Sequence, residues 1–268
     1  MSEVRVAVAG AGGRMGRALL EAATATEGVR LAAALELATS PLAGRDAGEL
    51  AAAAKGVRIG SDAGAALAAC DVLVDFTRPE GTLAHLAACR AAKRAMVIGT
   101  TGFDAAQLAQ IRAAAGEIAI VMAPNMSVGV NVAMKLVETA ARALGPEYDV
   151  EVFEIHHKLK VDAPSGTALK LGEVAAAARG TSLEKSAVHG RHGTTGERKP
   201  GAIGFSVARG GDIVGDHTVF FAGPGERIEI THRSSSRANY AQGAMRAAKF
   251  LAGKAPGLYD MQDVLGLK

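Results

Sequence analysis

The sequence lacks tryptophan, and aromatic residues make up only 4% of its 268 residues. Proteins that stack single-stranded nucleic acid, or that bind partners through large aromatic anchors, need more aromatic side chains than this. The net charge is only +3, from 30 Lys and Arg against 27 Asp and Glu, whereas nucleic-acid binding needs a clustered basic surface. We therefore expect no nucleic-acid partner.

Cysteine is also scarce. Cys70 and Cys89 are the only two and form no CxxC motif, so neither a disulfide framework nor a structural zinc site is expected. His189 and His192 form an HxxH motif, but no Asp, Glu or Cys stands beside them, and we predict no metal. No apolar run approaches the ~18–20 residues that span a bilayer, and the N-terminal residues lack a signal-peptide pattern. We expect a cytoplasmic protein without membrane contact.

The composition is that of a globular chain, with 49% hydrophobic and 21% charged residues. Up to Pro124, short β-rich runs alternate with Ala- and Leu-rich helical stretches, which is the βαβ rhythm of a parallel sheet. The expected strands are Val4–Ala9, Val29–Leu35, Val72–Phe76, Ala95–Ile98 and Ile118–Met122. The expected helices are Arg14–Thr24, Asp62–Ala69, Gly81–Lys93, Asp104–Ala115 and Asn131–Leu144.

The pattern changes after Tyr148, where strand-like runs follow one another through Gly-rich turns. Such clustering predicts an antiparallel or mixed sheet, and hence a second unit of the α+β class. Residues 181–201 are expected to form a long loop, and a final helix over Asn239–Leu251 to pack back on the first domain. The strands expected in the second unit are Val150–His156, Ile203–Arg209, Gly215–Ala222 and Glu226–His232, with a helix at Thr167–Ala178.

A glycine-rich segment, Gly10-Ala11-Gly12-Gly13-Arg14-Met15-Gly16, joins the first expected strand to the first helix. Glycine is needed there for the tight turn, for close approach to a pyrophosphate and for packing of helix on strand. Glu36 follows the next strand, where an acid can bind ribose hydroxyls. This context predicts a dinucleotide site, whereas the motif alone would also suit a turn that binds no phosphate.

Two further turns follow later strands. Gly99, Thr100, Thr101 and Gly102 come after Ala95–Ile98. Ala123, Pro124, Asn125 and Met126 come after Ile118–Met122. Ligands of open α/β sheets lie outside the carboxyl ends of the strands, so these turns are candidate walls of a nicotinamide site, or else ordinary βα turns. Asp75, at the end of another strand, is interpreted as an N-cap or turn residue.

The segment Glu154–Thr167 carries the clearest chemistry. It leaves a strand with His156, His157, Lys158 and Lys160, and then turns through Pro164 into a helix. Histidine can donate a proton near neutral pH, an ammonium group can stabilise developing negative charge, and a helix start binds anions. The pattern favours a site for a carboxylate-bearing substrate over a solvated basic turn. His85, His217 and His232 are interpreted as ordinary helix or strand residues.

These motifs together resemble the dihydrodipicolinate reductase family of the diaminopimelate and lysine pathway. The resemblance rests on GAGGRMG at Gly10–Gly16, GTTG at Gly99–Gly102, APNM at Ala123–Met126 and, above all, EIHHKLKVDAPSGTA at Glu154–Ala168. Segments 206–218 and 229–233 are similar to the C-terminal sheet of the family, so the resemblance runs nearly end to end.

The resemblance implies an α/β fold, with an N-terminal Rossmann-like parallel-sheet dinucleotide domain and a second α+β mixed-sheet domain for substrate binding and oligomerisation. The implied domains are residues 1–126, 127–238, and a C-terminal helix and tail, 239–268, that returns to the first domain. The implied partners are a small dicarboxylate and further copies of the chain in a homotetramer. The implied reaction is hydride transfer from NADH or NADPH to the dehydrated form of 4-hydroxy-tetrahydrodipicolinate, giving tetrahydrodipicolinate and water.

The resemblance also implies roles for single residues. His156 would donate the proton, Lys160 would act as second donor or electrostatic partner, and His157, Gly166 and Thr167 would bind the substrate carboxylates. The cofactor would be lined by Gly10, Ala11, Gly12, Gly13, Arg14, Met15, Glu36, Gly99, Thr100, Thr101, Ala123, Pro124, Asn125 and Met126.

One position departs from the family pattern. Similar members often carry Arg directly after the ribose-binding Glu, where it faces a 2′-phosphate, and this chain has Leu37 there. Loss of that cation weakens NADPH binding relative to NADH, although Arg14 and Arg17 offer partial compensation. We predict that NADH is used at least as well as NADPH.

Two other interpretations stay open on the sequence alone. The chain could be another two-domain NAD(P)-dependent oxidoreductase, acting on an amino acid or a semialdehyde. It could also be a Rossmann protein that senses NAD(H) without catalysis, which would explain the glycine motif and Glu36 but not the two histidines and Lys160 beside a helix start.

Overall fold

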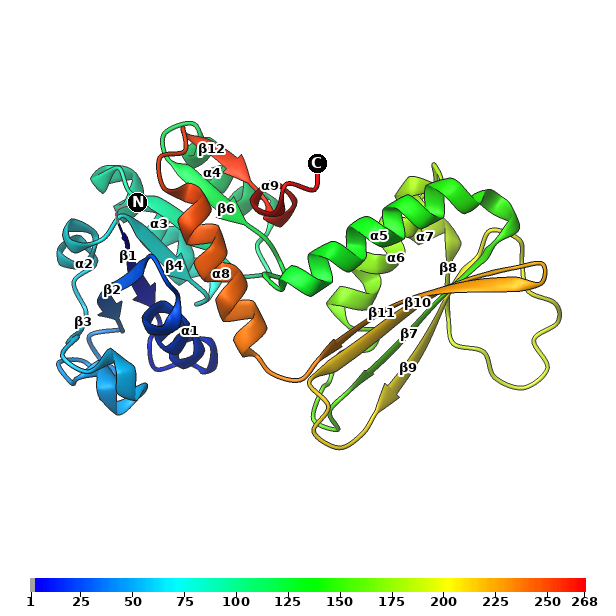
Figure 1. Ribbon diagram of the computed structural model, residues 1–268, viewed down its shortest axis with the longest axis horizontal. Coiled ribbons are helices and arrows are strands. Elements are labelled where there is room, and N and C mark those ends of the chain that lie inside the picture. Colours follow the sequence, from blue (N-terminus) through cyan, green and yellow to red (C-terminus); the bar gives the residue numbers. More distant parts are fainter. Residues whose placement is uncertain (1–2) are drawn as a thin grey trace. The chain divides into compact units, whose positions relative to one another are not determined.

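A computed structural model describes residues 3–268 and divides the chain into two compact units. The first unit comprises the chain up to Val128 together with Arg237–Lys268, and the second comprises Gly129–Ser236. Figure 1 shows the helices and strands of both units. Within residues 3–268, no helix combines the length and the apolar character that crossing a bilayer requires.

The first unit is built on a sheet in which all neighbouring strands are parallel, in the order β12-β6-β5-β4-β1-β2-β3. Its strands are β1 (Val4–Ala9), β2 (Val29–Leu35), β3 (Ile59–Gly60), β4 (Val72–Asp75), β5 (Ala95–Ile98), β6 (Ala119–Met122) and β12 (Gly257–Tyr259). Its α-helices are α1 (Arg14–Ala25), α2 (Ala63–Ala69), α3 (Pro79–Ala92), α4 (Ala105–Ala115), α8 (Ala238–Leu251) and α9 (Met261–Leu265). Two short 3₁₀ turns, Ala47–Glu49 and Ala52–Ala54, precede β3.

Helices cover both faces of this sheet. In β1, Val6 and Val8 point into one hydrophobic cluster while Ala7 and Ala9 point into another, as the two-residue period of a strand requires. The first cluster is completed by α1 and α8, and the second by α2, α3 and α4 (Figure 1). The parallel α/β architecture expected from the alternating pattern is therefore confirmed.

The strand order contains a reversal between β1 and β4. From β1 the chain proceeds to β2 and β3 on one side, and from β4 to β5 and β6 on the other. In open parallel sheets, the connections on the two sides of such a reversal leave a crevice at the carboxyl ends of the strands, where nucleotides bind. The glycine-rich segment after β1 lies at this edge.

The second unit is built on a mixed sheet in the order β11-β10-β7-β9-β8. Strands β11, β10 and β7 pair antiparallel, whereas β7, β9 and β8 pair parallel, so the expected mixed sheet is confirmed. Its strands are β7 (Asp149–His156), β8 (Ala187–His189), β9 (Ile203–Arg209), β10 (Gly215–Gly223) and β11 (Glu226–Ser234). Its helices are α5 (Val128–Leu144), α6 (Gly166–Ala178) and α7 (Leu183–Ser186), with a 3₁₀ turn at Gly145–Glu147.

One face of this sheet forms the core of the second unit. Val150 and Val152 of β7 are buried against α5 and α6, which lie along the same face in Figure 1. Phe153 points to the opposite face and remains 39% exposed. The alternation along β7 therefore separates a packed apolar face from an accessible one.

The structure adds short elements that the sequence pattern does not predict. The segment 181–201, expected as one long loop, contains α7 and the edge strand β8 before it continues without regular structure from Gly190. Strands β3 and β12 also lie at sheet edges and span only two and three residues. Such short strands carry too few residues to show a period of two.

Candidate functional site

The glycine-rich segment forms a tight loop at the carboxyl end of β1. Gly10 has a left-handed φ of +68°, and its carbonyl accepts a hydrogen bond from the Gly13 amide (N···O 3.0 Å). A Cβ at Gly16 would lie 2.0 Å from the Gly10 carbonyl oxygen, so α1 can approach the loop this closely only with glycine there. Arg14 and Met15 begin α1, and no side chain within residues 3–268 caps its start. The positive end of α1 is therefore suited to a phosphate group.

Glu36 follows β2 and lies against this loop. One carboxylate oxygen accepts a hydrogen bond from the Gly12 amide (2.8 Å), and the other accepts one from the Leu37 amide (3.2 Å). A Cβ at Gly12 would lie 3.0 Å from the first of these oxygens. Ala11 is fully buried, whereas the Leu37 side chain is 74% exposed. The acidic group and the glycine loop are thus adjacent, as a site for a ribose and a pyrophosphate requires.

The two later turns lie at the same edge of the sheet, because they follow the parallel strands β5 and β6. Thr100 is buried and Thr101 is exposed in the turn after β5. In the turn after β6, Ala123 and Met126 are buried, Pro124 is exposed, and the Asn125 side chain accepts a hydrogen bond from the Ser127 amide (2.9 Å). The structure therefore brings every cofactor residue predicted from the sequence to the carboxyl edge of one sheet.

Asp75, at the end of β4, is hydrogen-bonded to the turn after β5. It is fully buried and accepts hydrogen bonds from the hydroxyls of Thr77 (2.8 Å), Thr82 (2.9 Å) and Thr100 (3.1 Å). Its other oxygen lies 2.5 Å from Nδ1 of His85. Burial alone raises the pKa of Asp75, but the hydrogen bonds from His85 and Thr77 outweigh it and bring the pKa below its usual value. The ionised carboxylate fixes the β5 turn through Thr100.

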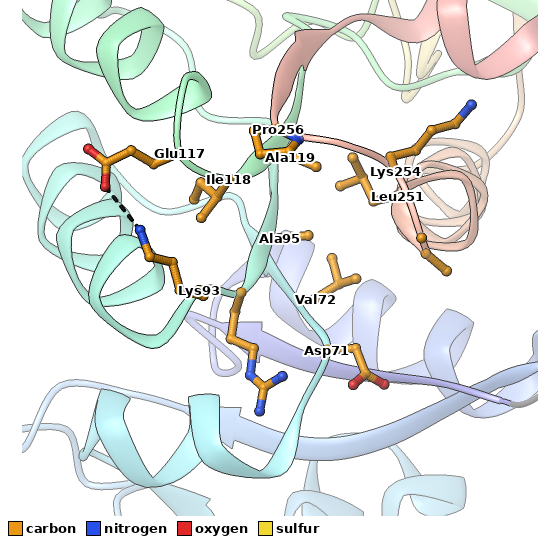
Figure 2. A pocket seen from close by; sticks show the side chains of 13 residues that line it. Asp71, Val72, Lys93, Ala95, Glu117, Ile118, Ala119, Leu251, Lys254 and Pro256 are labelled. Atoms are coloured by element: carbon orange, nitrogen blue, oxygen red, sulfur yellow. Dashed lines mark hydrogen bonds and ion pairs between the residues drawn. The ribbon is translucent and has the colours of Figure 1, made fainter.

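A pocket in the first unit lies at the other edge of the sheet. Figure 2 shows Asp71, Ile118 and Pro256 on its wall, and these residues immediately precede β4, β6 and β12. They therefore mark the amino ends of the strands. Nucleotides bind at the carboxyl ends in this fold class, so this pocket is separate from the predicted cofactor site.

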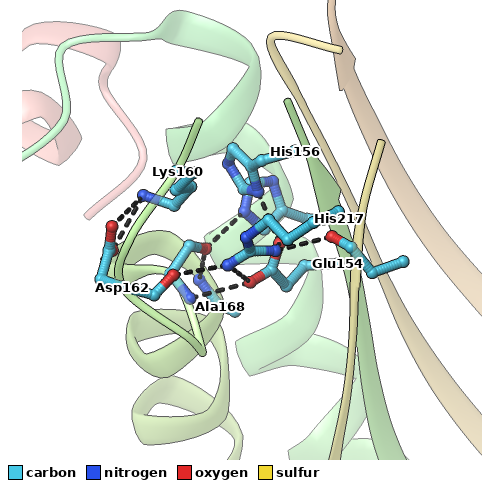
Figure 3. A network of polar contacts seen from close by, with 9 residues as sticks. Glu154, His156, Lys160, Asp162, Ala168 and His217 are labelled. Atoms are coloured by element: carbon cyan, nitrogen blue, oxygen red, sulfur yellow. Dashed lines mark hydrogen bonds and ion pairs between the residues drawn. The ribbon is translucent and has the colours of Figure 1, made fainter. Parts of the chain in front are cut away.

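In the second unit, β7 places Glu154 and His156 on the same buried face. His156 is 8% exposed, and its Nδ1 lies 2.5 Å from a Glu154 carboxylate oxygen (Figure 3). Burial alone raises the pKa of Glu154, but hydrogen bonds from Arg209, His156 and the Ser165 amide outweigh it, so its pKa lies below the usual value. An ionised carboxylate can only accept, so His156 Nδ1 is the donor. The ring nitrogen left for proton transfer is Nε2.

Lys160 lies in the turn that follows β7. Its ammonium group is 2.8 Å from both carboxylate oxygens of Asp162, and the Lys160 ion pair lowers the pKa of Asp162. Arg209 donates a hydrogen bond to the Asp162 carbonyl oxygen and two to Glu154. Lys160 and His156 are therefore part of one connected polar network, which Figure 3 shows from close by.

The start of α6 also belongs to this network, through Ser165. Ser165 caps the helix by accepting a hydrogen bond from the Ala168 amide (3.1 Å), and its own amide donates to Glu154 (3.0 Å). Its hydroxyl also shares a hydrogen bond with Nε2 of His217 (2.9 Å). The rings of His217 and His156 meet edge to face, with centroids 5.0 Å apart.

The three predicted substrate-binding residues lie in the same turn and helix start. Gly166 and Thr167 are the first residues of the 13-residue helix α6, and a Cβ at Gly166 would meet no atom within 4 Å. His157 follows His156 directly, and its buried Nδ1 has no hydrogen-bond partner within residues 3–268. A helix start that carries a positive partial charge, beside a histidine and a lysine, is suited to a carboxylate.

No functional role was assigned from the sequence to Glu154, Arg209, Ser165 or His217, although Glu154 and Ser165 lie in the segment Glu154–Thr167 that carries the clearest chemistry. Glu154 was detectable, because an acidic residue stands where the alternation of Val150 and Val152 calls for another buried apolar residue. Arg209 is 55 residues from Glu154 and His217 is 52 residues from Ser165, so no local pattern predicts these two contacts.

Comparison with known families matches both units. Residues 4–126 match the family described as "Dihydrodipicolinate reductase, N-terminus", and residues 129–265 match "Dihydrodipicolinate reductase, C-terminus". The chain is 62% identical over 268 residues to the 4-hydroxy-tetrahydrodipicolinate reductase of Laribacter hongkongensis, which covers 100% of both sequences. It is 64% identical over 263 residues to the enzyme of that name from Bordetella pertussis, covering 98% of this chain and 97% of that protein.

Solved structures agree with the family matches. The fold is similar to that of a dipicolinate-bound dihydrodipicolinate reductase from Paenisporosarcina sp. TG-14, with a TM-score of 0.79 and 25% identity over 97% of this chain and 98% of that one. GenD2 from gentamicin A biosynthesis, solved with NAD, has a TM-score of 0.63 and 17% identity over 100% of this chain and 91% of that one. At this identity the second likeness concerns the fold alone.

Proposed function

The chain belongs to the dihydrodipicolinate reductase family, and we propose that the Glu154–Thr167 segment carries its catalytic and substrate-binding residues. Its function is the reduction of 4-hydroxy-tetrahydrodipicolinate to tetrahydrodipicolinate and water with a hydride from NAD(P)H. The observation that carries the assignment of roles is the Glu154–His156 pair, which leaves a single histidine nitrogen for proton transfer next to a helix start suited to carboxylates.

The residues of the first unit fit a nicotinamide dinucleotide. Gly12 and Gly16 lack the Cβ atoms that would fill the loop, and Glu36 lies beside it. In the proposal, Gly10–Met15 hold the pyrophosphate, Glu36 holds the ribose, and residues 99–101 and 123–126 line the nicotinamide. Bound NADH or NADPH supplies the hydride.

The residues of the second unit complete the reduction, because each hydride added to the substrate ring must be matched by one proton. We assign that proton to Nε2 of the protonated His156 ring, which is left as the neutral Nδ1–H tautomer bonded to Glu154. Lys160 provides positive charge where the ring gains electron density, or acts as a second donor. His157, Gly166 and Thr167 bind the substrate carboxylates, with the positive end of α6 favouring the dianion.

The test is oxidation of NADH, and separately of NADPH, with substrate made fresh by a dihydrodipicolinate synthase from pyruvate and aspartate semialdehyde. His156→Ala and Lys160→Ala are each expected to lower kcat by about 100-fold or more, the usual contribution of an acid–base group. His192→Ala and Lys170→Ala, which remove exposed residues of the same unit, are the matched controls and should keep wild-type rates. Undiminished turnover in the His156→Ala/Lys160→Ala double variant would show that the site is elsewhere.

The cofactor preference follows from the environment of Glu36. Its carboxylate would face a 2′-phosphate with like charge, and Leu37 next to it offers no cation. We infer that NADH is used at least as well as NADPH. A KM for NADPH well below that for NADH, at equal kcat, would contradict this inference.

A homotetramer is proposed from the accessible face of the mixed sheet. Phe153 points out of this face with 39% of its surface exposed, and Thr218 and Thr231 beside it already satisfy each other through a hydrogen bond (3.0 Å). Exposed apolar surface beside polar groups that already bond to each other is suited to packing against a second copy. Light scattering is expected to give the mass of four chains, and Phe153→Lys a smaller particle. A monomeric wild-type chain would exclude this assembly.

A further inference from the structure

Glu154 occupies a position in β7 where an apolar residue would be expected. Val150, Val152 and Glu154 point to the same face, and Glu154 is fully buried there. Removing an ionised carboxylate from water is strongly unfavourable unless hydrogen bonds and positive charge compensate. A buried carboxylate in the core of the second unit therefore needs a compensating network.

That network is complete around Glu154. Arg209 donates from both terminal nitrogens to the two carboxylate oxygens (2.9 and 3.0 Å), the Ser165 amide donates to one of them (3.0 Å), and His156 Nδ1 donates to the other (2.5 Å). The two-pronged contact with a guanidinium group fixes the plane of the carboxylate as well as its charge. Because His156 Nδ1 bonds to this carboxylate, the orientation of the His156 ring is fixed as well.

Arg209 also reaches the segment that carries Lys160. It pairs with His156 in the parallel register of β7 and β9, and one of its terminal nitrogens donates to the Asp162 carbonyl oxygen (2.5 Å). The Asp162 carboxylate holds the Lys160 ammonium group at 2.8 Å. One guanidinium group therefore connects the carboxylate behind His156 with the turn that presents Lys160.

We propose that Glu154 and Arg209 are positioning residues. They keep the Nδ1–H of His156 bonded to the Glu154 carboxylate, so that the imidazolium directs its second proton, on Nε2, to the substrate, and they anchor the turn of Lys160. This inference rests on the proposed roles of His156 and Lys160. Neither Glu154 nor Arg209 acts on the substrate itself. A carboxylate that orients a catalytic imidazole and stabilises its protonated form can be worth orders of magnitude in rate, because the imidazolium then gives up its Nε2 proton and returns to the Nδ1–H tautomer that the carboxylate holds.

The principal variant is Glu154→Gln, which preserves shape but offers His156 an amide that can also donate. We expect kcat to fall about 100-fold, while the KM for substrate and the Kd for pyridine-2,6-dicarboxylate stay within about threefold, since the carboxylate-binding residues are untouched. In ¹⁵N NMR of histidine-labelled protein at alkaline pH, wild-type His156 is expected to carry its proton on Nδ1, and Glu154→Gln to shift the proton toward Nε2.

Glu151 provides a matched control on the same strand. Glu151 accepts hydrogen bonds from two arginines, Arg191 and Arg198, at distances similar to those between Glu154 and Arg209. Unlike Glu154, it does not contact His156. Glu151→Gln is expected to keep the wild-type kcat and the wild-type His156 signals. Arg209→Lys, which retains charge but loses the two-pronged contact, is expected to lower kcat less than Glu154→Gln does.

Three results would overturn the proposal. The first is a wild-type His156 that carries its proton on Nε2, which can be measured even if Glu154→Gln does not fold. The second is a folded Glu154→Gln variant with wild-type kcat, and the third is an equal loss of kcat in Glu154→Gln and Glu151→Gln. If His156→Ala itself kept full activity, the proposed function of this site would fail instead, so the two failures are distinguishable.

Discussion

The buried imidazole of His217 makes the stability of the protein depend on pH. It is 5% exposed on β10, and its Nδ1 is buried with no hydrogen-bond partner in the described chain, residues 3–268. Burial is the main cause that lowers its pKa from 6.5 to about 4. The charges of His156, His232 and Lys160 lower it further, while Glu154 raises it. Folded His217 is therefore neutral at pH 7.

The sign of the effect follows from proton uptake. As pH falls below 6.5, the unfolded chain protonates this histidine while the folded chain resists until about pH 4. The unfolded state thus binds more protons over this window, and stability is lost as pH falls through it. For these two pKa values the loss between about pH 7.5 and about pH 5 is about 2 kcal/mol. The contribution of His217 is fully present only above pH 6.5.

The perturbation is His217→Gln, whose amide can still bond the Ser165 hydroxyl. Urea unfolding followed by circular dichroism, at one protein concentration, would give the free energy of unfolding of both proteins at the two pH values. The wild type is expected to lose about 2 kcal/mol more than the variant on acidification, although the variant is less stable at the higher pH. His192→Gln, in an exposed part of the 190–201 segment, should follow the wild type. Parallel pH profiles for wild type and His217→Gln would refute the reasoning.

Three further outcomes are expected in the first unit. Gly16→Ala should weaken NADH binding at least about tenfold in calorimetry, because its Cβ would lie 2.0 Å from the Gly10 carbonyl oxygen. Leu37→Arg should lower the KM for NADPH by about tenfold and leave that for NADH nearly unchanged, through a charge-assisted bond to the 2′-phosphate. Thr82→Val should lower the free energy of unfolding by about 1–3 kcal/mol in urea titrations, since buried Asp75 loses a donor.

The fold could be predicted from the sequence where the apolar runs are long enough to show their period. Val4–Ala9 and Ala95–Ile98 have the predicted bounds in the structure. Strand β12 could not be predicted in this way, because Gly257–Tyr259 becomes a strand only by pairing with β6, far away in the chain. Its formation depends on a tertiary contact, which a local pattern does not contain.

The family could be predicted because its motif is contiguous. The resemblance carried by Glu154–Ala168 is confirmed by the match of residues 129–265 to the C-terminal family and of residues 4–126 to the N-terminal one. The roles of His156 and Lys160 stay predictions. Arg209 could not be found in the same way, since it meets Glu154 across 55 residues of sequence through the register of β7 and β9.

Asp75 and Glu154 share a sequence signal that indicates a buried polar cluster. Each is an acid inside or at the end of a run of buried apolar residues, in Val72–Asp75 and in β7, and each is fully buried. Each binds Nδ1 of a histidine and also fixes the loop or helix start that follows, through Thr100 in one unit and Ser165 in the other. Because a buried carboxylate is stable only when several donors surround it, an acid in a core strand predicts a polar cluster before its partners are known. In both units of this chain that cluster contacts the loop or helix start whose residues are predicted to bind the ligand.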